Sequence, residues 1–216
     1  MLTTRFTKLV GCSVPIQQAG MGALANKQLA AAVANAGGQG MISWSGMPAG
    51  TLAKLLDDLR QQTLGVFGVN FLIPGFEDEP HEIRQCVGAA AARAKVIDFF
   101  YHDPLPSLVE VVHQHGALAC WQVGSREEAV AEVDAGCDFI IAQGIEAGGH
   151  VRGKSGLMAL LNEVLEVVEV PVLAAGGIGT GRNMAAALAA GPRACGWARV
   201  LLPLRNPERT LSMRKP

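Results

Sequence analysis

Short apolar segments alternate with stretches of helical periodicity along most of this chain, and this alternation constrains the fold more than any other feature. Each apolar segment is rich in Val, Ile, Phe and Leu and is bounded by glycine or proline, which is typical of strands buried on both faces of a parallel sheet. Seven strands are predicted, at Val14–Gln18, Gly40–Ser43, Gly65–Ile73, Lys95–Tyr101, Ala117–Val123, Asp138–Gln143 and Val170–Ala175.

The stretches between the strands have the features of helices. Asn26 is predicted to cap the first helix, and the second shows leucines at helical spacing, at Leu52, Leu55, Leu56 and Leu59. Ser125 and Glu128 have the spacing of a capping box at the start of a third. Two more helices are predicted at Leu157–Val168 and Arg182–Ala190.

Strands that alternate with helices predict repeated right-handed βαβ units, which build either a (β/α)8 barrel or an open doubly wound sheet. The strand count and the polar residues at the carboxyl ends of several strands favour the barrel. The chain has 216 residues, fewer than the roughly 250 typical of that fold. We therefore predict an α/β protein with a TIM barrel that is incomplete at the eighth βα unit, in a single domain, 1–216, with an atypical tail at 192–216.

The composition of the chain argues against several classes of binding partner. The net charge is −1 and the 18 Lys and Arg are scattered, which argues against nucleic acid and anionic membranes as partners. The apolar runs are shorter than the roughly 18 residues of a membrane span. Five cysteines stand far apart, as is typical of reduced thiols, and no His or carboxylate spacing indicates a metal site. We expect a cytoplasmic protein without metal.

Two glycine-rich segments follow the sixth and seventh predicted strands. Gly176 and Gly177 precede a helix, so their backbone N–H groups could bind a phosphate, although an ordinary turn explains the segment equally well. His150 follows Gly148 and Gly149, which lets its imidazole approach a ligand and exchange a proton with it. An isolated loop histidine is more often a solvated bystander. His102, at the end of the fourth strand, is a weaker candidate for the same role.

Other candidates lie at the ends of the first, third and sixth strands. Asn70 interrupts an apolar strand, and its amide needs partners because leaving it unsatisfied would cost about 1–3 kcal/mol. Those partners could come from a ligand or from a neighbouring loop. Gln143 could present its amide to a planar heterocycle. Small residues at Gly20 and Gly22, with Met21 between them, allow close approach to a flat ring, and a tight turn is the alternative.

Together these segments resemble the FMN-dependent nitronate monooxygenases. The matching motifs are PIQQAGMG (15–22), GVNF (68–71), AQGIEAGGH (142–150) and AAGGI (174–178), in the order and spacing of that family. The resemblance covers about residues 10–191, and the AQG-x-EAGGH motif is the most specific.

The resemblance implies a TIM barrel that binds FMN across its mouth. Gly20, Met21 and Gly22 would lie beside the isoalloxazine, and Asn70 and Gln143 would hydrogen-bond to it. Gly148, Gly176 and Gly177 would lie near the phosphate, and His150 would be the catalytic residue. A small nitronate or nitroalkane would react with O2 to give a carbonyl compound and nitrite. The alternatives are an NAD(P)H-dependent enoyl-acyl-carrier-protein or quinone reductase and an inactive barrel fragment. A homodimer stays open.

The resemblance stops after Gly191, where the family carries an eighth strand that reads Val-Arg-Val-Gly-Thr-Arg-Phe. Codons for Ala194 to Leu201, read from their third bases, can encode those seven residues in order. We therefore predict a one-base slip near Gly191 and an out-of-frame tail at 192–216. Such a tail lacks the second phosphate-binding Gly-Thr of the family.

Overall fold

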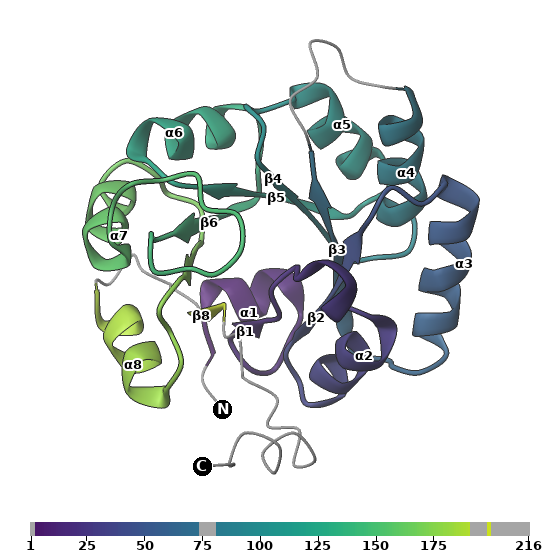
Figure 1. The fold of residues 1–216 in the computed structure, drawn as a ribbon, viewed down its shortest axis with the longest axis horizontal. Coiled ribbons are helices and arrows are strands. Elements are labelled where there is room, and N and C mark those ends of the chain that lie inside the picture. Colours follow the sequence, from purple (N-terminus) through teal and green to yellow (C-terminus); the bar gives the residue numbers. More distant parts are fainter. Residues whose placement is uncertain (1–2, 74–80, 191–197, 200–216) are drawn as a thin grey trace, which may run out of the picture.

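The computed structural model describes residues 3–73, 81–190 and 198–199. Its sheet is a closed barrel in which eight parallel strands follow one another in sequence order (Figure 1). This confirms the predicted (β/α)8 architecture. The strands are β1 Ile16–Gln17, β2 Gln39–Trp44, β3 Val66–Leu72, β4 Val96–Phe100, β5 Leu118–Val123, β6 Phe139–Gln143, β7 Val172–Ala175 and β8 Ala198–Arg199.

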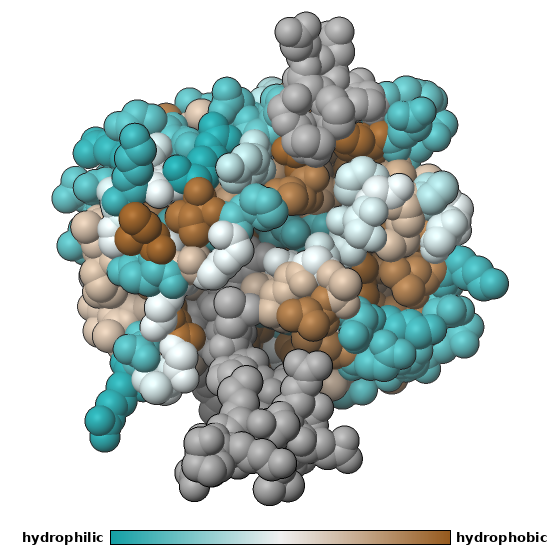
Figure 2. Space-filling view, in the orientation of Figure 1, coloured by the Kyte–Doolittle hydropathy of each residue, from teal (hydrophilic) through white to brown (hydrophobic). Residues whose placement is uncertain are grey.

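Helices surround the barrel and present hydrophilic side chains at much of the periphery, whereas hydrophobic ones gather toward the middle of the face in Figure 2. Asn26 caps α2 as predicted, because its Oδ1 accepts a hydrogen bond of 3.0 Å from Leu29 N. The helices are α1 Arg5–Val10, α2 Lys27–Asn35, α3 Ala49–Arg60, α4 His81–Ala91, α5 Pro106–Gln114, α6 Arg126–Asp134, α7 Leu157–Leu165 and α8 Gly181–Ala189, with a 3-10 turn, η1, at Gly22–Leu24.

The first and last of the seven predicted strands are shorter than expected. Ser13 N and Val14 N both donate to Gly37 O at 2.9 Å, so this segment is held in a turn and β1 starts only at Ile16. Strand β7 begins at Val172, directly after Pro171, which has no N–H to contribute to a ladder. The hydrogen bonds to Gly37 O join residues far apart in sequence, so the apolar pattern could not show that Ser13 and Val14 form a turn.

The predicted capping box at the start of α6 forms only by half. Ser125 Oγ accepts from Glu128 N at 3.2 Å, as expected. The Glu128 carboxylate does not return to Ser125 N: it accepts from Gly124 N at 2.6 Å and pairs with Arg152 at 2.8 Å. A guanidinium within reach is a stronger partner for a carboxylate than a backbone amide alone.

Strand alternation divides the apolar core into two parts. Outward-facing residues such as Phe71, Phe99 and Trp121 pack under the helices, and their rings form a row with Trp44 across β2 to β5. The second cluster lies inside the barrel and includes Phe6 of α1, whose ring meets Phe139 at 5.4 Å. Helix α1 therefore covers the amino-terminal end of the barrel, and the carboxyl end is left for a site.

The eighth strand has only two residues, as β1 does. Ala198 pairs with Ile16 and Ala174, and Arg199 pairs with Gln17 and Ala175, so two residues close the sheet. The remainder of the 192–216 tail, and with it the predicted change of reading frame, lies outside the described residues. In the part that is described, no helix has the length and apolar character needed to cross a membrane.

Candidate active site

A cavity of about 810 Å³ opens at the carboxyl ends of the strands. This volume is in the range of ligand sites, and the end of the barrel is the one that carries active sites in this fold. The nine residues to which the family resemblance gives a catalytic or cofactor-binding role all line this cavity: Gly20, Met21, Gly22, Asn70, Gln143, Gly148, His150, Gly176 and Gly177. What they bind stays a prediction.

The Asn70 amide is held by a neighbouring strand rather than by a loop. Its Nδ2 donates to Asp98 Oδ2 at 3.0 Å, and both side chains are buried. A Cβ atom on Gly20 would lie 2.3 Å from Asn70 Oδ1, so the amide occupies the space that any other residue at this position would need. The absence of a side chain at Gly20 therefore lets the Asn70 amide pack directly against the backbone at this position.

Gln143 links the barrel wall to the loop that carries His150. Its Nε2 donates to the backbone oxygen of His150 at 3.0 Å. Its Oε1 is buried and has no hydrogen-bond partner within the described part of the chain. An unsatisfied buried carbonyl is costly, so this oxygen is available to accept a hydrogen bond from a ligand N–H group.

His150 lies exposed at the rim of the cavity. Its imidazole packs against the Tyr101 ring, with centroids 5.4 Å apart and planes at 70°. The weaker candidate His102 is not among the cavity-lining residues, and its Nδ1 lies 2.8 Å from Asp103 O. Of the two histidines that the sequence placed at this mouth, His150 therefore lines the cavity and His102 does not.

The glycines after β7 adopt conformations that favour glycine. Gly176 has φ +112° and Gly177 has φ +65°. A Cβ atom on Gly176 would come within 3.0 Å of Ala147 N and Gly144 O, so the loops after β6 and β7 touch at this point. Helix α8 starts four residues later, capped by Thr180. The positive end of its dipole and the backbone N–H groups before it suit an anion.

Sequence reasoning gave no role to Glu146, Trp44, Phe100 or Gln122, which also line the cavity. The Glu146 carboxylate accepts from Leu157 N at 2.9 and 3.1 Å and so caps α7. The sequence could have identified Gln122 as a candidate site residue, since it is a polar residue inside an apolar strand, as Asn70 is. Both side chains are buried.

Three of the described thiols offer little nucleophilic chemistry. Burial raises the pKa of Cys12 to about 11 and raises those of Cys86 and Cys137, so these thiols stay protonated at neutral pH. Across the described ranges, no three His, Cys, Asp or Glu side chains are grouped so that they could hold a metal ion. Glu146 and His150 are the ionisable residues that line the cavity, and the Glu146 carboxylate already accepts from Leu157 N.

Together these features fit a large planar ligand with an anionic end. The Gly20 backbone, a buried acceptor at Gln143 and the glycines before α8 line one cavity. An isoalloxazine presents ring N–H and carbonyl groups, and a ribityl phosphate presents the anion. The residues present therefore fit FMN.

Comparison with known proteins gives a consistent result. The family model described as nitronate monooxygenase matches residues 3–202, past Gly191, where the motif agreement ends. A nitronate monooxygenase of Pseudomonas aeruginosa is 37% identical over 94% of this chain and 70% of its own length. A (3aS,4S,5R,7aS)-5-hydroxy-7a-methyl-1-oxo-octahydro-1H-indene-4-carboxyl-CoA dehydrogenase of Rhodococcus jostii is 35% identical over 88% of this chain and 52% of its own.

Solved structures resemble the barrel closely. FabK from Thermotoga maritima superposes with a TM-score of 0.82 at 35% identity, over 92% of this chain and 61% of its own. Nitroalkane oxidase from Streptomyces ansochromogenes gives a TM-score of 0.79 at 30% identity, over 90% of this chain and 67% of its own. This chain thus spans about half to two thirds of the length of most of these relatives.

Proposed function

Because the chain belongs to the nitronate monooxygenase family, we propose that it binds FMN at the barrel mouth and oxidises alkyl nitronates with O2. The products would be a carbonyl compound and nitrite. The observation that carries this proposal is the position of His150, whose imidazole lies at the rim of a cavity with the features of a flavin site.

Each group of lining residues would hold one part of the cofactor. Gly20, Met21 and Gly22 would lie against the isoalloxazine, and Asn70 and Gln143 would hydrogen-bond to it. The phosphate would take backbone N–H groups near Gly148, Gly176 and Gly177, together with the positive end of the α8 dipole. FMN, when bound, supplies the redox chemistry that carries electrons from the substrate to O2.

His150 would act on the substrate. A nitronate carries negative charge on its nitro oxygens, and an imidazole N–H can donate a hydrogen bond to them. A neutral nitroalkane must first lose its α-proton, which a neutral imidazole can accept. The hydrogen bond from Gln143 Nε2 to His150 O ties the loop that carries this ring to the end of β6.

A second candidate is an NAD(P)H-dependent flavin reductase, because this barrel is as similar to FabK and to the Rhodococcus jostii dehydrogenase as to nitroalkane-oxidising relatives. In such an enzyme the same FMN site would accept a hydride from a nicotinamide. The cavity residues described above would serve both reactions.

One experiment distinguishes these functions from each other and from an inactive fragment. The purified chain is titrated with FMN, and flavin fluorescence and absorbance report binding. The complex is then mixed anaerobically with propyl-2-nitronate or with NADH. Bleaching of the flavin absorbance by the nitronate alone supports the proposal, and bleaching by NADH alone supports the reductase. Failure of FMN to bind would contradict both.

A further inference from the structure

Tyr101 has a backbone conformation that its side chain disfavours. Its φ of 80° is the one positive value among the non-glycine residues of the described chain. A bulky side chain in this left-handed region meets steric strain, so the surrounding structure must hold it there. Such strain is commonly found where a fold aims a side chain at a functional site.

The strained turn places the Tyr101 ring against His150, which lines the cavity. The ring meets the His150 imidazole at 5.4 Å and 70°, and it meets the Phe100 ring at 5.4 Å and 83°. Edge-to-face contacts of this kind are favourable and directional. Tyr101 is 46% exposed, so the contact with His150 is not a by-product of core packing.

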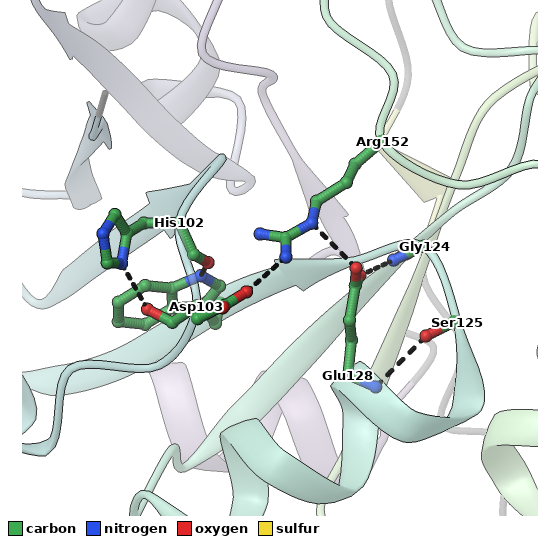
Figure 3. A network of polar contacts seen from close by, with 7 residues as sticks. His102, Asp103, Gly124, Ser125, Glu128 and Arg152 are labelled. Atoms are coloured by element: carbon green, nitrogen blue, oxygen red, sulfur yellow. Dashed lines mark hydrogen bonds and ion pairs between the residues drawn. The ribbon is translucent and has the colours of Figure 1, made fainter. Parts of the chain in front are cut away.

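The turn is fixed on its carboxyl side by two further contacts. His102 O accepts from the indole Nε1 of Trp121 at 3.1 Å, and Trp121 is fully buried. The Asp103 carboxylate forms an ion pair with Arg152. Figure 3 shows the guanidinium of Arg152 between Asp103 and Glu128, with the His102 ring turned away from it.

Arg152 lies only two residues after His150, so the same ion pairs also fix the loop that carries the imidazole. Glu128 Oε1 binds Arg152 Nε at 2.8 Å, and the other carboxylate oxygen accepts from Gly124 N at 2.6 Å. The Arg152 and Glu128 side chains are 29% and 26% exposed, so solvent screens their ion pair less than it screens a fully exposed one.

We propose that Tyr101 is a positioning residue for His150, and that Arg152, Asp103 and Glu128 form a latch that keeps the two rings in contact. The proposal rests on the function assigned above to His150. The latch joins the turn after β4 to the loop after β6, which are about fifty residues apart in sequence. With the latch closed, the imidazole is held in one orientation at the rim of the cavity.

The ring contact can be tested without flavin and without turnover. In the 216-residue chain labelled with 13C-histidine, the imidazole resonances of His150 are assigned by their loss in His150→Asn. Tyr101→Phe keeps an aromatic ring and should leave these resonances in place. Tyr101→Asn removes the ring, and the resonances should move because the ring-current contribution is lost. Unmoved resonances in Tyr101→Asn would overturn the proposal.

The thermal midpoint of unfolding distinguishes a positioning role of Tyr101 from a role in packing the fold. Asparagine tolerates the left-handed region, so Tyr101→Asn should leave the thermal midpoint unchanged or raise it. A clear fall in the midpoint of Tyr101→Asn would show that the ring supports the fold and would also overturn the proposal. Tyr101→Phe should match the parent in both measurements.

The latch is tested through Arg152. Arg152→Gln should shift the His150 resonances and lower kcat on a nitronate by roughly tenfold to a hundredfold, the range expected for a misplaced catalytic group, with little change in KM. Arg126→Gln is the matched control, since Arg126, the first residue of α6, forms an exposed ion pair with Glu166. Normal resonances and kcat in Arg152→Gln would contradict the latch. If the parent chain does not turn over a nitronate, the proposed function is contradicted. The His150 resonances then still test whether Tyr101 and Arg152 position the imidazole.

Discussion

At the scale of single residues, His150 gives the most direct prediction about activity. Losing a hydrogen bond to a charged group costs about 1.5–3 kcal/mol, so His150→Asn should lower kcat/KM for a nitronate about tenfold to a hundredfold. A neutral nitroalkane also needs proton removal, typically worth 10²- to 10⁴-fold, and should suffer more. Steady-state kinetics on both substrates test this, in a parent that accepts both, with FMN content as the control. Full activity on both would make His150 a bystander.

The buried carboxyl of Glu132 should make the free energy of unfolding depend on pH. Its burial, followed by the charge of Glu128, raises its pKa to about 9 against the opposing charge of Arg152. Between pH 4.5 and pH 9 the folded state therefore holds one more proton than the unfolded state. Its contribution to the free energy of unfolding should then fall as pH rises, by at most about 1.4 kcal/mol per unit.

The measurement is urea unfolding at pH 6 and pH 8. Glu132→Gln should lose this part of the slope and exceed the parent in stability at pH 8. Glu127→Gln, on the exposed side of the same helix, should behave as the parent does. Equal slopes for Glu132→Gln and the parent would show that the buried carboxyl keeps an ordinary titration.

At the scale of elements, α7 depends on a cap from outside its own sequence. Its N-cap is Gly156, which offers no side chain, and Glu146 accepts from Leu157 N in its place. Glu146→Ala should cost about 1 kcal/mol in free energy of unfolding, as loss of a helix cap does. Urea unfolding measures this, with Glu163→Ala on the exposed face of α7 as the control. Equal losses in the two variants would contradict the cap.

The elements themselves were largely predictable because strands and helices carry local patterns. Alternation of apolar runs with helical spacing located the first seven strands, and Asn26 and Ser125 marked helix starts that the structure confirms. Helix α1 was not anticipated because it has only six residues, too few to display a period. The second half of the Ser125–Glu128 box failed because the competing cation, Arg152, lies 24 residues further along the chain.

The same distinction applies to the site. The glycines and polar residues that line the cavity were identifiable because they lie near or just after the carboxyl ends of β1, β3, β6 and β7. Tyr101 and Arg152 were not, since their importance depends on partners in other loops, His150 and Asp103. A sequence shows which residues a strand carries to the mouth, but not which loops meet there.

At the scale of the whole molecule, the barrel is closed by two short strands. Both β1 and β8 have two residues, so the β7–β8–β1 seam has few backbone hydrogen bonds to protect it. We expect a chain read in the family's frame after Gly191 to bind FMN about tenfold to a hundredfold more tightly, because a second Gly-Thr would reach the phosphate. Fluorescence titration of both chains measures this. Equal, stoichiometric binding would contradict the role assigned to the tail.

The aromatic row on the outer wall has a further, optical consequence. Trp44 belongs both to that row, through its 5.3 Å contact with Phe71, and to the lining of the cavity. Indole emits light at wavelengths that an oxidised flavin absorbs, and energy transfer between them is efficient at contact range. The barrel therefore carries its own fluorescent reporter, and filling the cavity with a flavin should darken Trp44 without any added label.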